Sequence, residues 1–313
     1  MSSCILQGEG GIGKQIASTS LISELKKRYE KIYVFSSYPD VFWGLADRSF
    51  GFEIPYGYQD YYEKADDIFF PSPYRNNDFR KHRINLCESF YNCCGFEYNK
   101  QQPQIILKST EIELAKKIKR DIGTFIIVQL HGAVSPYNNP NQPKPQPKIV
   151  KNYPNELAEK LVEEIKKKYN IQVVNMHLPN ENPIKGTLEI NLPYRQWFAL
   201  LTQAETFVSI DSSLQHAGTA VNKKGIVLWG GTDPKMYGYD IHTNLSGDCE
   251  NIHCTRPYFV PSSDIVENQI YECPTKHCMN IPVEKILNEI KITKNIQKPT
   301  IDLEKHICNG CKK

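Results

Sequence analysis

The sequence predicts an α/β protein built from two Rossmann-like, doubly wound domains. Its amino-terminal end reads strand, glycine turn, helix, strand, which is a βαβ unit. Its second half alternates apolar runs with segments of helical period, the order expected of a parallel sheet covered by helices. Two of the later apolar runs end in polar turns, and ligands of such sheets bind at the carboxyl ends of the strands.

The first βαβ unit comprises SSCILQ as a strand, a glycine turn, a helix and KIYVFSS as the second strand. The helix is expected from about Lys14 to Arg28. Its apolar face is formed by Ile16, Leu21, Ile22 and Leu25. This face should pack against the sheet.

The glycine turn from Gly8 to Lys14 satisfies the G-x4-G-K part of a phosphate-binding P-loop. Gln15 then stands where a P-loop has Ser or Thr as the magnesium ligand. The later segment TFVSID could supply the acidic strand of such an enzyme. A P-loop-like phosphotransferase or NTPase is therefore one alternative.

The segment between the first βαβ unit and residue 121 gives weaker signals. IFFPSP is expected to be a strand, and KHRINLCESFYNCCGF a helix in which Cys87, Cys93 and Cys94 are buried apolar residues. The aromatic and basic residues of PYRNNDFRKHR suit a surface that binds sugars, bases or phosphates, such as those of a substrate, or a solvated loop. TEIELAKKIKRDIG is an amphipathic helix that closes a first domain of residues 1–121.

The second domain is expected over residues 122–292, followed by a tail of residues 293–313. TFIIVQLHG and NIQVVNM are strands, and NELAEKLVEEIKKKY is a clear helix after a long Pro/Asn-rich loop. PYRQWFALLTQAE is a helix with Trp197, Leu200 and Leu201 facing inward. VEKILNEIK forms a further helix near the end.

The most informative stretch runs from Thr206 to Tyr239. The apolar run TFVSI ends at Asp211, and Ser212 and Ser213 precede LQHAGTAV, which has helical spacing. Free N–H groups at a helix N-terminus favour an anion such as phosphate. A second apolar run, GIVLW, leads into the turn G-G-T-D-P, so two strand ends and one helix start converge.

This stretch resembles a family signature. D-S-S-L-Q-H-A-G-T-A followed by a strand and G-G-T-D-P is similar to the pattern D-[ST]-G-x-x-H-x-A-A-A and G-x-T-x-P of the heptosyltransferases of glycosyltransferase family 9. Ser213 replaces the usual Gly. The resemblance covers residues 4–35 and 123–290, and the G-G-I-G-K turn also resembles bacteriophage glycosyltransferases. It implies the GT-B fold, in which two Rossmann-like domains face a cleft.

The resemblance also implies an activity and a set of donor-binding residues. The activity is transfer of a sugar from a nucleotide-diphosphate sugar to an unidentified acceptor, with inversion and without a catalytic metal. Asp211, Ser212, Ser213 and His216 would surround the diphosphate and sugar, Lys151 would face the donor phosphate, and Glu181 would lie near the ribose or base. His131 and Thr232 lie at strand exits and complete the donor-binding set.

The reacting groups are predicted at the glycine turn, which in this family lies between donor and acceptor. Lys14 stands where the family carries an acid, so Lys14 would act as an electrostatic clamp on the departing diphosphate. A carboxylate must deprotonate the acceptor hydroxyl, and Glu9 and Asp40 lie at expected strand exits. The missing acid at position 14 leaves a non-catalytic nucleotide-sugar-binding module as a second alternative.

Composition narrows the class of protein. The 313 residues are 40% hydrophobic and 23% charged, which excludes disordered and fibrous classes. A net charge of +3 selects neither a nucleic acid nor an anionic membrane. No apolar run is long enough to span a bilayer and no secretory signal is present, so we expect a cytoplasmic protein.

The sequence does not identify the acceptor of the transferred sugar. A lipopolysaccharide or capsule glycan, a protein side chain and a modified DNA base are all compatible acceptors.

The chain has 10 cysteines, many for a cytoplasmic protein. Cys249, Cys254, Cys273 and Cys278 form two close pairs separated by a loop, as in structural zinc or iron sites. Some heptosyltransferases that act on bacterial proteins carry a cysteine-bound iron in this part of the chain. Cys308, Cys311, His253 and His277 are alternative ligands, and buried thiols without metal are the competing interpretation.

Overall fold

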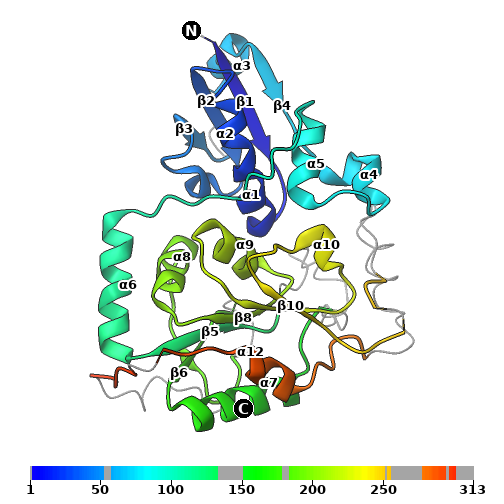
Figure 1. Cartoon of the computed structure of the whole chain (residues 1–313). Helices are drawn as coiled ribbons and strands as arrows, with labels where there is room; N and C mark the ends of the chain where they lie inside the picture. Colours follow the sequence, from blue (N-terminus) through cyan, green and yellow to red (C-terminus); the bar gives the residue numbers. More distant parts are fainter. Residues whose placement is uncertain are drawn as a thin grey trace, which may run out of the picture.

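The computed structural model describes residues 2–52, 58–132, 151–177, 183–250, 252–254, 277–293 and 296–300. The chain forms two lobes, each built around a sheet in which all pairings are parallel (Figure 1). This confirms the predicted α/β class with two Rossmann-like lobes. Within the described residues, no helix combines the length and apolar character needed to cross a membrane.

The amino-terminal lobe contains a sheet of order β3-β2-β1-β4. Its strands are β1 (Ser3–Gly8), β2 (Lys31–Ser36), β3 (Arg48–Phe50) and β4 (Asp67–Phe69). Its helices are α1 (Ile12–Ser18), α2 (Ile22–Leu25), α3 (Gln59–Lys64), α4 (Asn77–Arg80) and α5 (Leu86–Cys93), with 3-10 turns at Thr19–Leu21, Pro39–Phe42 and Pro73–Arg75. β1 and β2 pair in register from Ser3 and Lys31 onward, as the βαβ unit requires.

The first helix is shorter than the sequence predicts, because a run of hydroxyl residues interrupts it. The hydroxyls of Ser18, Thr19 and Ser20 each donate to the carbonyl three residues earlier, at 2.6 to 2.8 Å. Such bonds compete with the α-helical ladder. The chain therefore passes through a 3-10 turn, and α2 ends at Leu25 instead of Arg28.

The helix predicted from Lys81 to Phe96 is also shorter. Asn85 caps α5 by accepting from the backbone N–H of Glu88, so the helix begins at Leu86. Cys87 is buried as predicted, whereas Cys94 is half-buried and Cys93 is exposed. The prediction that all three thiols are buried is wrong for Cys93, which follows the last buried turn of the helix.

The second lobe contains a sheet of order β10-β9-β8-β5-β6-β7. Its strands are β5 (Phe125–Gln129), β6 (Gln172–Asn175), β7 (Leu188–Glu189), β8 (Phe207–Ile210), β9 (Ile226–Trp229) and β10 (Thr243–Ser246). Its helices are α7 (Asn155–Tyr169), α8 (Tyr194–Gln203), α9 (Ser213–Ala220), α10 (Pro234–Tyr237) and α12 (Val283–Glu289). These elements match the predicted order of strands and helices, and Trp197, Leu200 and Leu201 are buried as expected.

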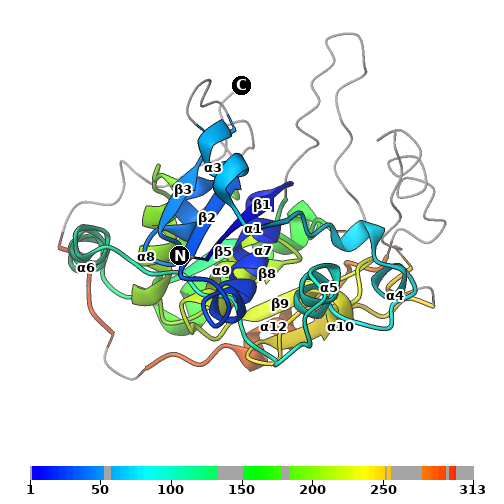
Figure 2. The same ribbon diagram turned by 90° about the horizontal axis from the view of Figure 1, so that it is seen from above.

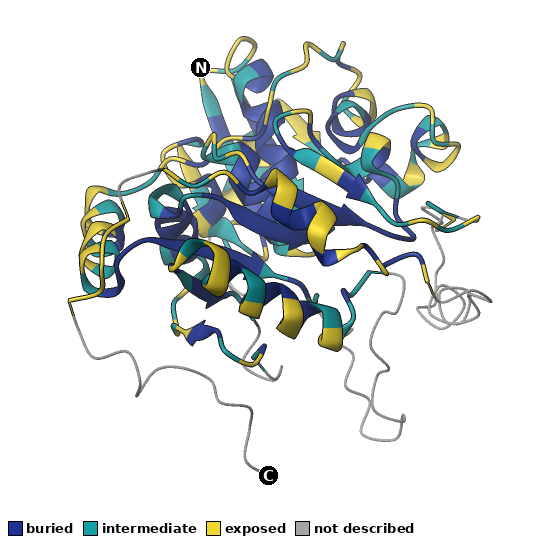
Figure 3. Cartoon of the chain, turned by 60° about the horizontal axis from the view of Figure 1, so that its bottom comes forward, coloured by how far each residue is buried: buried dark blue, intermediate teal, exposed yellow. Residues whose placement is uncertain are grey.

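Both faces of this sheet are covered by helices, because alternate residues of the central strand point to opposite sides. Phe125 and Ile127 pack in a cluster with α8 and α9. Ile126 and Val128 pack in a second cluster with α7 and α12. The helices turn their exposed residues outward and leave the strands buried (Figure 3).

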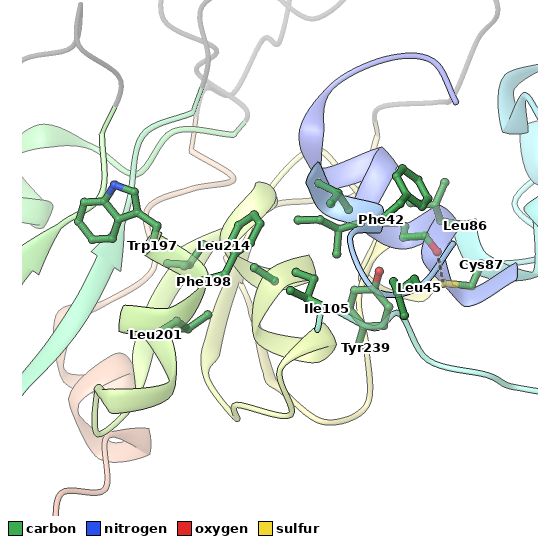
Figure 4. Close-up of a cluster of buried hydrophobic side chains, with 14 of the residues drawn as sticks. Phe42, Leu45, Leu86, Cys87, Ile105, Trp197, Phe198, Leu201, Leu214 and Tyr239 are labelled. Carbon is green, nitrogen blue, oxygen red and sulfur yellow. Dashed lines mark hydrogen bonds between the residues drawn. The ribbon is translucent and has the colours of Figure 1, made fainter. Parts of the chain in front are cut away.

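The first of these clusters continues into the amino-terminal lobe. Figure 4 shows Phe42, Leu45 and Leu86 of that lobe in the same group of side chains as Leu214 and Tyr239 of the second lobe. Burial of apolar surface is the dominant favourable term in folding. The two lobes are therefore joined by a common apolar core.

A buried ion pair fastens the connecting helix α6 (Ser109–Ile122) across the lobes. α6 packs beside α8, as Figure 2 shows from above. Arg195 on α8 donates to both carboxylate oxygens of Glu111 on α6, at 2.6 and 2.8 Å. The same guanidinium donates to the carbonyls of Asp40 and Ile106, at 2.6 and 2.7 Å. One buried arginine thus connects four segments of the chain.

Helix α1 approaches α9 closely at a glycine. A Cβ added to Gly13 would lie 2.7 Å from Cδ2 of His216 and 3.4 Å from Cα of Ser213. The first distance is shorter than side chains tolerate, and Ser213 approaches through its backbone. Only glycine fits between the two helices without displacing them.

We predict that Gly13→Ala lowers the free energy of unfolding by about 1–3 kcal/mol, the usual cost of overpacking an interface of this density. Chemical denaturation measures the change. Gly11→Ala is the matched control, since a Cβ at Gly11 meets nothing within 4 Å. Equal stability of the two variants would show that the lobes do not meet at Gly13.

Candidate donor-binding site

The centre of the site is an ion pair between Asp211 and Lys151. Asp211 directly follows β8, and its Oδ2 lies 2.7 Å from Nζ of Lys151. Burial raises the pKa of Asp211, but the ammonium of Lys151 outweighs this effect and holds the pKa below its ordinary value. Burial likewise opposes charge on Lys151, whose pKa is raised because Asp211 lies beside it. Both groups are therefore charged at neutral pH.

Lys151 is held in place by the residues that follow it. The backbone N–H of Tyr153 donates to the carbonyl of Leu130, and the Asn152 side chain accepts from the N–H of Gly132, both at 2.9 Å. The Tyr153 hydroxyl donates to the carbonyl of Ile281 at 2.6 Å. These bonds attach the segment to the end of β5. The predicted donor-site residue His131 lies in the same place, with Nε2 3.1 Å from the carbonyl of Tyr153.

The N-terminus of α9 is capped by a residue that the sequence did not single out. Gln129, the last residue of β5, accepts at Oε1 from the hydroxyl of Ser212 at 2.6 Å and from the N–H of Leu214 at 3.2 Å. Ser212 makes no side-chain cap of its own. The predicted Ser212 hydroxyl is thus held by Gln129, while Ser213 is partly exposed and adjoins Gly13. A polar residue ending an apolar strand was the only sequence signal for Gln129.

His216 lies under the glycine turn and is neutral. Its Nδ1 is 2.7 Å from the hydroxyl of Tyr239, and its ring is 5% exposed. Burial lowers the pKa of His216 to about 4, which Asp211 only partly opposes. At neutral pH this histidine can donate or accept a hydrogen bond, but it brings no positive charge to a phosphate.

Two buried polar atoms beside Asp211 have no hydrogen-bond partner among the described residues: Oε1 of Gln215 and Oγ1 of Thr232. Gln215 donates through Nε2 to Oδ1 of Asp211 at 3.4 Å and to the carbonyl of Tyr237 at 3.1 Å. Thr232 is close enough to help lower the pKa of Asp211, although its hydroxyl makes no bond of good geometry. Native proteins leave few buried polar groups unpaired.

The amino-terminal lobe contributes Lys14 and Glu9. Nζ of Lys14 lies 3.6 Å from Oε1 of Glu9 and 5.0 Å from the ring centre of Tyr74. Burial lowers the pKa of Lys14, and Glu9 partly offsets this. Burial also raises the pKa of the Tyr74 hydroxyl, which lies near enough to Lys151 and Asp211 to respond to both charges. Tyr74 thus contacts Lys14 and lies near Lys151.

The segment that contains Tyr74 contacts the second lobe. Phe79 is fully buried, and its ring stacks edge-on against Tyr237 at 5.6 Å. Nδ1 of His82 lies 3.8 Å from Oδ2 of Asp233, in the G-G-T-D-P turn. The stretch predicted as an acceptor surface or a solvated loop thus packs partly against the donor side of the molecule.

Other predicted residues lie apart from this cluster or outside the described residues. The carbonyl of Asp40 accepts from Arg195, and the pKa of the half-buried Tyr194 is raised by burial and then by the Asp40 carboxylate, so the known contacts of Asp40 are with the start of α8. Glu181 lies outside the described residues.

The predicted cysteine site is only partly visible. Cys278 is buried, Cys249 is half-buried and Cys254 is exposed, while Cys273, Cys308 and Cys311 lie outside the described residues. Among the residues that are described, no group of three or more His, Cys, Asp or Glu side chains could hold a metal ion. The structure gives no support to the prediction of bound zinc or iron.

Comparisons with known proteins agree with the fold and the signature. The model of glycosyltransferase family 9 (heptosyltransferase) matches residues 187–256, which include Asp211, His216 and Thr232. No curated protein sequence matches the chain.

Solved structures share the fold at low sequence identity. A glycosyltransferase family 9 protein from Veillonella parvula matches with a TM-score of 0.65 at 12% identity, covering 92% of this chain and 95% of the other. ADP-heptose lipopolysaccharide heptosyltransferase II of E. coli matches with a TM-score of 0.58 at 13% identity, covering 88% and 98%. The iron-containing heptosyltransferase TibC of enterotoxigenic E. coli, in complex with ADP-D-β-D-heptose, matches with a TM-score of 0.60 at 13% identity, covering 92% and 76%.

These findings confirm the resemblance predicted from the signature. The chain has the GT-B fold of the heptosyltransferases, and its residues 187–256, around Asp211, match the model of glycosyltransferase family 9; together these support a glycosyltransferase.

Proposed function

We propose that this protein transfers a sugar from a nucleotide-diphosphate sugar to an acceptor hydroxyl, with inversion and without a catalytic metal. The acceptor, whether a lipopolysaccharide or capsule glycan, a protein side chain or a modified DNA base, is left open. The proposal places the reaction in the cytoplasm, where nucleotide sugars are made.

The observation that carries the proposal is that a lysine from each lobe lies beside the residues of the family signature, Asp211 to His216. Lys151 pairs with Asp211 at the carboxyl end of β8, and Lys14 of the opposite lobe directly follows Gly13, which packs against His216. A departing diphosphate gains negative charge as the glycosidic bond breaks, and cations fixed in advance stabilise it. Two ammonium groups and the N-terminus of α9 can provide this stabilisation.

The geometry disfavours a P-loop enzyme. Gln15, at the position of the magnesium ligand, is 1% exposed and uses both ends of its amide inside the protein. Its Nε2 donates to the carbonyl of Glu9 at 2.6 Å, and its Oε1 accepts from the hydroxyl of Ser36 at 2.9 Å. The acidic segment ending at Asp211 belongs to β8 in the other sheet, whereas the glycine turn follows β1.

A non-catalytic binding module requires that no base reach the acceptor. Glu9 adjoins Lys14, accepts from Ser72 at 3.0 Å and keeps 42% of its side chain exposed. Asp40 has no described contact with the lysine cluster. We therefore assign the general base to Glu9, which favours an enzyme over a binding module.

Lys151→Met should weaken binding of ADP-D-β-D-heptose by about 30-fold or more, because a charge-assisted hydrogen bond contributes roughly 2–3 kcal/mol. Titration calorimetry measures the dissociation constant. Lys160→Met is the matched control, since Lys160 on α7 is half-exposed and its nearest acid, Glu284, is 3.8 Å away. Unchanged affinity in the Lys151 variant would show that Lys151 does not bind the donor.

Glu9→Gln should lower kcat by about 100-fold or more while leaving the KM for the donor nearly unchanged, the usual effect of losing a general base. Steady-state rates of nucleotide release give both constants. Asp40→Asn is the comparison, and a larger loss of kcat in that variant would identify Asp40 as the general base.

Transfer should continue in EDTA, because lysines supply the charge that a metal provides in other transferases. The product should carry the anomeric configuration opposite to that of the donor, as proton coupling constants in its NMR spectrum would reveal. Loss of the activity in EDTA and its recovery with Mg²⁺ would contradict the metal-independent mechanism.

A further inference from the structure

Gln215 has a fixed orientation that leaves one acceptor unused. Its amide nitrogen faces two acceptors, the carboxylate of Asp211 and the carbonyl of Tyr237. The opposite orientation would place Oε1 against both of these oxygens, so the assignment of nitrogen and oxygen follows from the partners. Oε1 is therefore an acceptor that needs a donor, and none exists among the described residues.

Thr232 adds a second buried hydroxyl next to the same carboxylate, close enough to help lower the pKa of Asp211 but without a hydrogen bond of good geometry among the described residues. Gln215 is 0% exposed and Thr232 is 4% exposed, so bulk water does not reach either side chain freely. An unpaired buried acceptor costs free energy until it finds a partner. That partner must donate at Gln215 and can donate or accept at Thr232.

These requirements select the chemistry of the partner. A phosphate oxygen at neutral pH accepts hydrogen bonds and cannot satisfy Oε1 of Gln215. A sugar hydroxyl donates one hydrogen bond and accepts others, so neighbouring hydroxyls of one ring can satisfy both side chains. The charges of Lys151 and Asp211 lie beside the same two groups.

We propose that Gln215 and Thr232 recognise hydroxyl groups of the transferred sugar and thereby contribute to donor specificity. This inference rests on the proposed function. The lysines hold the diphosphate, while the amide and the hydroxyl read the sugar next to it.

The sugar reaches these atoms when their cover moves. The cover includes the four-residue helix α10, whose Tyr237 carbonyl binds Gln215, and Phe79 of the opposite lobe stacks on the ring of Tyr237. Phe79 of the opposite lobe thus contributes to this cover.

The test compares Thr232→Val with the wild-type protein, using ADP and ADP-D-β-D-heptose as the two probes in titration calorimetry. Valine keeps the shape of threonine and removes only the hydroxyl. We expect affinity for ADP to change less than twofold and affinity for ADP-D-β-D-heptose to fall about tenfold, the effect of one lost hydrogen bond. Gln215→Met also removes the amide nitrogen that donates to Asp211 and to the Tyr237 carbonyl, so it should weaken binding of both probes, with the larger loss for ADP-D-β-D-heptose.

Thr206→Val is the control for a purely structural effect. The hydroxyl of Thr206 donates to the carbonyl of Lys224 at 3.2 Å, away from Asp211. This variant should lose thermal stability and bind both probes normally, whereas Thr232→Val should lose affinity for ADP-D-β-D-heptose.

The outcomes separate the two proposals. Suppose that the wild-type protein binds both probes and that the Thr232 and Gln215 variants lose affinity for both equally, or for neither. A buried water then satisfies these groups, and this inference is overturned while the proposed function stands. If wild type binds neither probe, the proposed use of this donor fails and the inference fails with it.

Discussion

The close approach of α1 to α9 is the constraint on which the site depends. Gly13 has no Cβ, so the glycine turn can pack directly over His216 and the backbone of Ser213. This contact brings the carboxyl ends of two separate parallel sheets toward each other. Lys14 from one sheet and Lys151 from the other can then act on a single ligand.

The basic residues of the site differ in how well their neighbours compensate their charge. Lys151 is partly buried, which opposes its charge, and Asp211 at 2.7 Å more than offsets this effect. His216 avoids the same difficulty by remaining neutral and bonding to Tyr239. Lys14 is less strongly compensated, because Glu9 is 3.6 Å away and shared with Ser72. Binding of an anion would relieve the burial cost at Lys14.

The lobes are connected by apolar packing as well as by polar contacts. The shared core runs from Phe42 to Tyr239, and Arg195 binds Glu111 and two carbonyl groups at the connecting helix. Phe79 and His82 add contacts with Tyr237 and Asp233 of the second lobe.

The sequence by itself determined the α/β class, the order of most strands and helices, and the place of Asp211 after a buried strand. These features follow from local periodicity and from the rule that ligands bind at the carboxyl ends of parallel strands. The family signature also pointed to Lys151, which the structure places on Asp211.

Only the tertiary structure decided which side chains meet. Gln129 caps α9, and Tyr74 lies under the ammonium of Lys14, although each is distant in the sequence from its partner. Local pattern also failed where hydroxyl groups of Ser18, Thr19 and Ser20 broke a helix. Periodicity records which face of an element is buried, whereas hydrogen bonds between distant residues depend on how the elements pack, so the sequence could not specify them.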